Sequence, residues 1–104
     1  MAIINGDNIA NVLDGTRNAD TIYGFDGIDI INGDRGNDSI YGGAGNDVLE
    51  GGAGNDLFYW TLGDGNDVIS DQRGTETLHI MGVSAADSLS FNLDLSGNFY
   101  TITI

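Results

Sequence analysis

The chain of 104 residues contains no cysteine, no proline and no lysine. Without cysteine it can form neither a disulfide nor a thiolate metal site, and its composition gives no redox signal. Three arginines stand against 16 Asp and Glu, which gives a formal net charge of −13 at pH 7. This charge excludes phosphate backbones and anionic membranes as electrostatic partners, so cations are the natural counterpart.

Long apolar runs are also missing, since none reaches the roughly 18 residues of a membrane-spanning helix. The opening Met-Ala-Ile-Ile lacks the basic flank and apolar core of a secretory signal, so we expect no cleavable export signal in this chain. High negative charge with 17 glycines is also compatible with disorder. However, 40% of the residues are apolar and recur in a fixed register, which favours one folded domain with a modest core.

A nine-residue period runs through residues 6–70. The stretch GGAGNDVLEGGAGNDLFY repeats itself after nine residues, and reading in both directions gives six contiguous units: 6–14, 15–23, 24–32, 33–41, 42–50 and 51–59. A seventh unit, 60–70, follows after a slip of two residues. Short fixed periods are typical of solenoids, in which each unit buries its apolar face against its neighbours.

Three columns of this alignment have a physical role. The sixth column holds a carboxylate in every unit but the first: Asp20, Asp29, Asp38, Asp47, Asp56 and Asp67. The eighth column is apolar throughout: Leu13, Ile22, Ile31, Ile40, Leu49, Phe58 and Ile69. Glycine opens the six contiguous units and fills the fourth column from Gly27 onward, which suits turns with positive φ. Each unit therefore predicts a turn followed by a short strand.

If one coil uses two units, alternate strands form two parallel sheets and alternate turns stack on the same side. This arrangement gives two ladders, one of Asp20, Asp38 and Asp56 and the other of Asn11, Asp29 and Asp47. Adjacent coils lie ~4.8 Å apart, a separation at which unscreened carboxylates repel strongly. A cation between each pair removes the repulsion. Oxygen-only surroundings suit calcium better than magnesium, which keeps several waters, or zinc, which prefers His or Cys.

The units resemble the G-G-x-G-x-D-x-U-x repeat of the RTX (repeats-in-toxin), or haemolysin-type, calcium-binding family. GGAGNDVLE and GGAGNDLFY match this pattern fully, and GDRGNDSIY and GFDGIDIIN match it nearly. The resemblance covers residues 6–70 and implies an all-β, right-handed parallel β-roll solenoid with two repeats per coil and a C-terminal β cap. It also implies about three to five calcium ions between stacked turns.

On this chain the resemblance assigns two groups of calcium ligands. The carboxylates are the six aspartates of the sixth column. The backbone ligands belong to the turn residues Gly27, Gly33, Asp34, Arg35, Gly36, Gly42, Gly43, Ala44, Gly45, Gly51, Gly52, Ala53 and Gly54. Departures from the pattern at Ile9, Asn11 and Asn18 predict weaker sites at the N-terminal end, so the sites between units two and six are the best defined.

Beyond Ser70 the period ends, so we divide one domain into a roll (1–70) and capping strands with a hairpin (71–104). Residues 83–87 contain a Ser-x-x-Asp pattern suited to one helical turn, and the hairpin is predicted around DLSGN at 94–98. A cap is expected because a solenoid end exposes its core and its strand edges. We also expect the chain to be a module of a longer protein.

Other candidate sites have simpler explanations. His79 has no Cys or second His to complete a transition-metal or nucleophile set, so we expect a structural role. Paired carboxylates resemble a glycosidase pair, but their register favours metal ligation, and we expect no enzyme. An EF-hand pattern is absent. Tyr23, Tyr41 and Tyr59 share the ninth column of alternate units, where they form either a packing ladder or a platform for a sugar.

Two functions remain. The resemblance implies a module that folds on calcium binding and supports type I secretion of a parent protein by a Gram-negative bacterium, with an extracellular destination. The chain is also similar to the repeat domains of mannuronan epimerases, which engage an anionic polysaccharide such as alginate. That function requires Arg17, Arg35 and Arg73 to act together or through calcium; Arg17 and Arg35 share the third column of units two and four.

Overall fold

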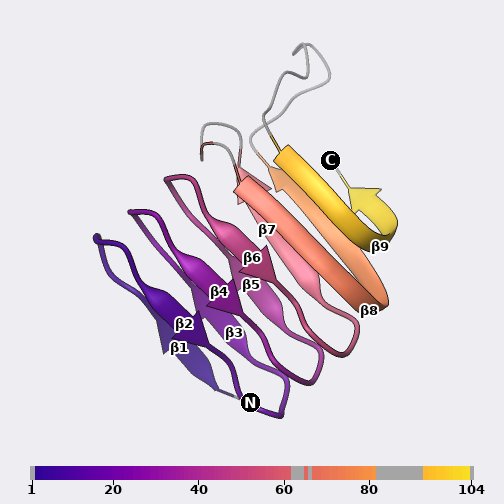
Figure 1. Cartoon of the computed structure of the whole chain (residues 1–104). Helices are drawn as coiled ribbons and strands as arrows, with labels where there is room; N and C mark the ends of the chain where they lie inside the picture. Colours follow the sequence, from indigo (N-terminus) through magenta and orange to yellow (C-terminus); the bar gives the residue numbers. More distant parts are fainter. Residues whose placement is uncertain (1, 62–64, 66, 82–92, 104) are drawn as a thin grey trace.

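The computed structural model describes residues 2–61, 65, 67–81 and 93–103, which form a parallel β-solenoid of about four turns (Figure 1). The strands are β1 (Ile3–Asn5), β2 (Val12–Asp14), β3 (Thr21–Tyr23), β4 (Ile30–Asn32), β5 (Ser39–Tyr41), β6 (Val48–Glu50), β7 (Leu57–Thr61), β8 (Asp67–Met81) and β9 (Leu93–Thr103). These residues contain no helix long and apolar enough to cross a membrane. The predicted all-β parallel roll is confirmed.

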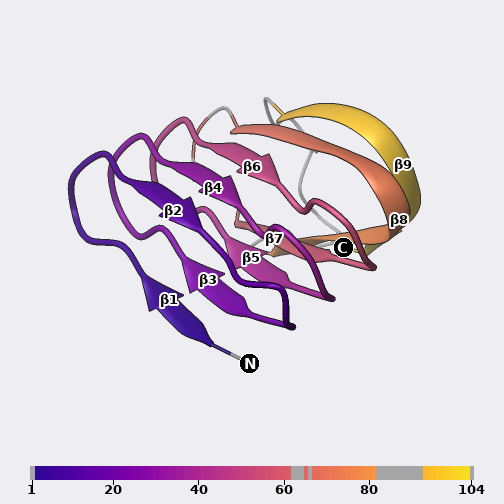
Figure 2. The same ribbon diagram turned by 60° about the horizontal axis from the view of Figure 1, so that its bottom comes forward.

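Alternate strands pair in parallel and form two facing layers (Figure 2). One layer consists of β1, β3, β5 and β7, and the other of β2, β4 and β6. The long β8 belongs to both, because its first part pairs with β6 and its second part with β7. Equivalent residues of successive coils are 18 positions apart, so one coil uses two nine-residue units, as the sequence predicts.

The eighth column fills the space between the two layers. Its fully buried side chains are Ile22, Ile31, Ile40, Leu49, Phe58 and Ile69. Ile4 and Leu13 pack against this core but stay partly exposed, because β1 and β2 each have one neighbouring strand. Burying one such side chain contributes about 2 kcal/mol. A three-residue strand buries a single core residue, so the stability of the fold depends on stacking several coils.

A two-residue insertion lengthens the last coil of the roll. Between β7 and β8 equivalent positions are 20 residues apart, and Phe58 pairs with Leu78. The added residue Trp60 pairs with Ile80, and both are 2% exposed. Because side chains alternate between the two faces of a strand, an insertion of two residues keeps the inward face inward.

The nine-residue period continues in space beyond the point where the sequence analysis ended it. Leu78 occupies an eighth-column position, and Gly74, Glu76 and His79 occupy the fourth, sixth and ninth positions of a further unit spanning 71–79. Glu76 is fully buried, like the aspartates of its column. The sequence hides this unit because Asp71 replaces the opening glycine and Glu76 replaces the sixth-column Asp.

The hairpin predicted around residues 94–98 is wrong. These residues lie within β9, which pairs with β8 in parallel from Asp67↔Leu93 to His79↔Thr103, with irregularities on both sides of Glu76. β9 therefore follows the course of β8 and lies at the end of the roll as one more layer of strand (Figure 2). The helical turn predicted at 83–87 lies outside the described residues.

Candidate metal centre

The sixth-column carboxylates form two ladders, one at each turn edge of the roll. Oδ1 of each aspartate accepts a hydrogen bond from the backbone N–H of the sixth-column residue one coil earlier. These bonds, 2.8–2.9 Å long, run from Asp20 to Asp38, from Asp38 to Asp56, from Asp29 to Asp47 and from Asp47 to Asp67. The structure therefore brings the predicted residues together in register, and Asp67 keeps its place in spite of the insertion.

These six aspartates are at most 2% exposed, although buried carboxylates are normally paired or bound to a metal. Oδ2 of Asp29 and Oδ2 of Asp38 are buried and receive no hydrogen bond from the described part of the chain. Burying a charged oxygen without compensation is costly. Each of these two oxygens therefore requires a cation or a proton.

The acidities of these groups reflect that cost. Burial raises the pKa of Asp38 to about 6, against a hydrogen bond from the Asp20 backbone that lowers it, and the negative charges of Asp20 and Asp34 raise it further. Burial also raises the pKa of Asp29 above its usual value of 3.8. Stacking the coils thus raises the free energy of the ionised carboxylates. A divalent cation bound beside them would lower it.

The carboxylate oxygens of Asp20, in contrast, receive hydrogen bonds from the chain. The N–H of Thr16 donates to Asp20 Oδ2 at 2.6 Å, and the Thr16 hydroxyl lies 2.9 Å from both carboxylate oxygens. Burial opposes the charge of Asp20, but these bonds and one from the Ala2 N–H lower its pKa overall. In the first unit, Asn11 Oδ1 likewise accepts the N–H of Asp7 at 3.0 Å. Sequence reasoning missed this closure, for which the second unit carries a signal in the hydroxyl of Thr16 in the second column.

From the third unit on, the turns have another backbone conformation. Their second and fourth columns adopt positive φ, in the pairs Phe25 and Gly27, Asp34 and Gly36, Gly43 and Gly45, and Gly52 and Gly54. Phe25 (φ 67°) and Asp34 (φ 72°) hold a conformation that glycine adopts without strain. In the third and fourth units this turn coincides with the carboxylate oxygens that have no hydrogen bond.

Carbonyl oxygens lie beside these carboxylates. A Cβ added to Gly24 would lie 2.5 Å from the carbonyl oxygen of Gly42 in the next coil and 2.7 Å from Asp29 Oδ2. A Cβ added to Gly33 would likewise meet the Gly51 carbonyl oxygen of the next coil and Asp38 Oδ2. Glycine is needed in the first column because a side chain there would fill the space between a carboxylate and a carbonyl of the neighbouring coil.

The other predicted turn residues lie at the same edges. The carbonyl oxygens of Gly27, Asp34 and Gly36 point at the glycines one coil later, which are Gly45, Gly52 and Gly54. Arg35 bridges to Ala53 between coils, and Gly43 and Ala44 belong to the equivalent turn of the fifth unit. The assignment of individual carbonyl groups as metal ligands stays a prediction.

The donor set fits a hard cation. It consists of carboxylate and carbonyl oxygens, gathered where turns of two coils stack. Nowhere in residues 2–61, 65, 67–81 and 93–103 do three His, Cys, Asp or Glu side chains come together to hold a metal by themselves. The turn carbonyls beside the carboxylates could supply further oxygen ligands, and such a set suits calcium better than zinc.

A parallel β-roll with stacked carboxylates and glycines at its turns defines a class of metal-binding repeat modules. The family model of the RTX calcium-binding nonapeptide repeat (4 copies) matches residues 5–38 and 23–58, which together make up more than half of the chain. The chain belongs to this family. It is a calcium-binding module, and RTX repeat proteins are typically secreted. A search of curated proteins returned no match.

The predicted tyrosine row is present on the outer face of the β1–β3–β5–β7 layer. The rings of Tyr23 and Tyr41 stack at 4.7 Å, those of Tyr41 and Tyr59 at 4.1 Å, and His79 continues the row at 5.6 Å from Tyr59. Burial and a hydrogen bond with Tyr59 raise the pKa of Tyr41 to about 12. The rings therefore pack against one another as a ladder, and whether the row also holds a sugar stays a prediction.

Proposed function

We propose that this chain is a module that folds on calcium binding and thereby supports type I secretion and extracellular stability of a parent protein. The observation that carries the proposal is the pair of buried oxygens, Asp29 Oδ2 and Asp38 Oδ2, which lack a hydrogen bond and face carbonyls of the next coil. At low cytosolic calcium, these charges oppose coil stacking. Outside the cell, the free energy of metal binding is added to that of folding.

In this proposal about three to five calcium ions lie between stacked turns. The carboxylates of the two ladders and the carbonyls of the turns at 24–27, 33–36, 42–45 and 51–54 hold them. Bound calcium neutralises the buried charges, while the chain supplies the spacing and excludes water. A chain that stays unfolded before export can thread a channel of the Gram-negative secretion machinery and fold on the far side. No catalytic activity is part of the proposal.

The test is a calcium titration followed by far-UV circular dichroism and Trp60 fluorescence. Because Trp60 is 2% exposed in the folded roll, its emission should move to shorter wavelength as β structure forms. We expect coil with a chelator, β structure in millimolar calcium and poor replacement by magnesium, which dehydrates reluctantly. Identical spectra with chelator and with calcium would refute calcium-dependent folding, and a roll already folded at submicromolar calcium would remove the export rationale.

A second candidate function is binding of an anionic, alginate-like polysaccharide as a module of a secreted carbohydrate-active enzyme. Arg17 and Arg35 favour it, because both are exposed and lie one coil apart on the same turn edge, where the N–H of Arg35 donates to the Thr16 carbonyl at 3.2 Å. Titration of the calcium-loaded protein with alginate tests this candidate. If the wild type binds alginate, the double change of Arg17→Ala and Arg35→Ala should abolish binding. Failure of the wild-type protein to bind alginate would exclude this function.

A further inference from the structure

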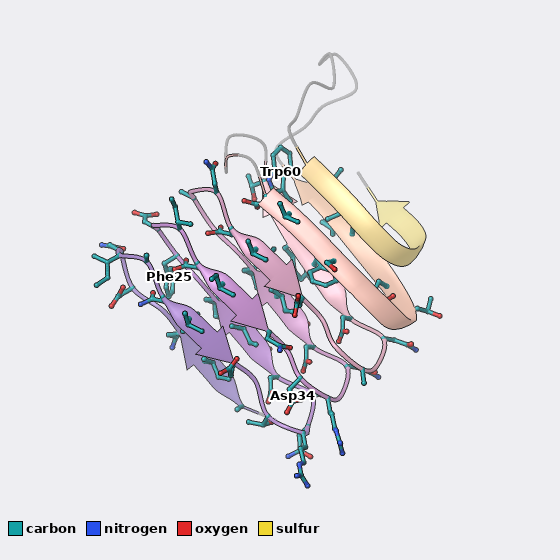
Figure 3. The ribbon with its side chains drawn as sticks, viewed as in Figure 1. Phe25, Asp34 and Trp60 are labelled. Atoms are coloured by element: carbon teal, nitrogen blue, oxygen red, sulfur yellow. The ribbon has the colours of Figure 1, made fainter. Side chains whose placement is uncertain are left out.

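We propose that Phe25 and the polar groups beside it bind a neutral β-linked polysaccharide. Phe25 lies in the turn of the third unit, at the opposite turn edge from Asp34 (Figure 3). The residue is 46% exposed, so its ring contributes nothing to the core between the sheets. This surface is separate from the arginine edge, and it uses the Phe25 side chain, whereas the calcium sites use backbone and carboxylate oxygens.

The backbone conformation of Phe25 favours glycine, so the fold does not require an aromatic residue at this position. The second column requires positive φ from the third unit on, and glycine fills it as Gly43 and Gly52. Phe25 adopts the same region with φ 67°, which is strained for a bulky side chain. Asp34 holds the same conformation in the fourth unit, so the feature particular to Phe25 is its large exposed ring at a position that glycine fills in the later units.

Neighbouring rings fix the position of this side chain. The Phe25 and Tyr23 rings stack at 6.0 Å with 20° between their planes, which extends the tyrosine ladder by one ring. The inner tyrosines hide their faces in the stack, whereas Phe25 stands at its exposed end. Asp26 follows Phe25 in the turn, and Asn5 pairs with Tyr23 on the edge strand; both are exposed and can form hydrogen bonds.

A sugar residue matches this combination of groups. A pyranose packs its C–H face on an aromatic ring and directs its hydroxyls sideways to amide, carboxylate and phenol groups. A β-1,4-linked chain is a straight ribbon whose sugar residues advance by about the spacing of neighbouring strands, ~4.8 Å. Its successive residues can therefore follow the row of Tyr23, Tyr41 and Tyr59 across the sheet.

Charge decides the class of polysaccharide. The chain has a net charge of −13, and Asp26 stands directly beside the ring. An anionic polymer at this face would be repelled, whereas an uncharged one would not. A protein partner is the poorer match, since protein hot spots are aromatic anchors that fill fully desolvated pockets and Phe25 stands on an exposed turn.

Two matched variants test the site. Phe25→Gly and Asp34→Gly each place glycine in the second column at a positive φ, and only the first removes the ring. Both changes relieve backbone strain, but Asp34→Gly also removes a negative charge that acts on Asp38, so the calcium midpoint is determined for each variant before binding is compared. Folding is checked first by circular dichroism in saturating calcium, which separates failure of this site from failure of calcium-dependent folding.

Binding is then measured by calorimetry with cellohexaose, a soluble galactomannan and, as the charged probe, alginate. We expect the wild type to bind a neutral probe, Phe25→Gly to weaken binding by about tenfold or more, and Asp34→Gly to change it by less than about twofold. The proposal is overturned if the folded wild type binds neither neutral probe or prefers alginate. It is also overturned if Phe25→Gly binds normally, or if both variants lose binding equally.

Discussion

At the scale of single residues, one carboxylate oxygen determines how each turn is held. In the second unit Thr16 donates two hydrogen-bonding groups to Asp20, and that turn is closed without a metal. In the third and fourth units, the equivalent oxygens of Asp29 and Asp38 have no such donor among the described residues. Turns of nearly the same sequence pattern therefore differ in whether the chain itself satisfies the carboxylate, and we expect them to differ in their dependence on calcium.

This difference gives a prediction for Asp38→Asn. The amide keeps an oxygen that can accept the Asp20 N–H but removes the buried charge, so the adjacent ions lose a carboxylate ligand. We expect a shift of the folding midpoint to higher calcium and a loss of about 3 kcal/mol of metal-linked stability. Calcium titrations followed by circular dichroism measure both quantities.

The matched control is Asp14→Asn, which removes the same charge from an exposed position at the end of β2. Its midpoint should stay within experimental error of the wild type, because the carboxylate lies outside both ladders. Equal shifts for the two variants would mean that total negative charge governs calcium binding, and that the nine-residue register does not.

The sequence predicts the ladders and the core well because Asp in the sixth column and an apolar residue in the eighth recur with little variation. It does not predict the closed turns. The closed turns of the first two units differ from the later turns in the backbone φ of the second column, which is left-handed at Phe25 and Asp34 although their side chains disfavour that region. A residue-by-residue comparison could not show which turns would be open, because the conformation is imposed by stacking on neighbouring coils.

At the scale of a single turn and strand, the first-column glycine limits how closely two coils can stack. We predict that Gly24→Ala destabilises the calcium-loaded roll by about 2 kcal/mol, because the new methyl group would meet the Gly42 carbonyl and Asp29 Oδ2. The φ of Gly24 is not positive, so steric exclusion and not backbone strain causes the loss. Thermal denaturation in saturating calcium measures it.

Asn8→Ala serves as the comparison for this change, since Asn8 is an exposed turn residue of the first unit. Its effect should lie within about 0.5 kcal/mol of zero. If Gly24→Ala were equally harmless, the first column would have room for a side chain, and the proposed cation position beside it would be wrong.

The eighth unit, residues 71–79, departs from the repeat pattern at the level of a single turn and strand, so it was not found in the sequence. DQRGTETLH keeps a fourth-column glycine and an eighth-column leucine, but it has Asp71 in place of the opening glycine and Glu76 in place of Asp. Neither change prevents strand pairing, because backbone hydrogen bonds and one buried leucine per strand suffice to continue the stack. The hairpin was mispredicted because DLSGN suits a turn locally, whereas the segment pairs with β8 in parallel and follows its course.

At the scale of the whole molecule, the buried carboxylates link folding to pH. The pKa of Asp38 is raised from 3.8 to about 6 in the metal-free fold, so the folded state binds this proton more tightly than the unfolded chain. The resulting stability is fully present below about pH 4 and is lost as the pH rises through about 6. Asp29, whose pKa is also raised, acts in the same direction.

We therefore predict that the metal-free chain gains β structure when the pH falls from 7 to about 5, whereas calcium binds less tightly because protons compete for the same oxygens. Circular dichroism with chelator across this range tests the first part, and calcium titrations at both pH values test the second. Asp38→Asn should reduce the acid response. A metal-free chain that loses structure on acidification would contradict this linkage.

The longer last coil has a consequence for how such a protein can change its length during evolution. A duplicated pair of ordinary units would stack on any coil before β7, because each of these coils presents the same width and the same columns. It would not cover the extra width that Trp60 and Ile80 give to the terminal coil. We therefore expect repeats to be gained or lost on the N-terminal side of Trp60, where a duplication leaves the junction with β9 unchanged.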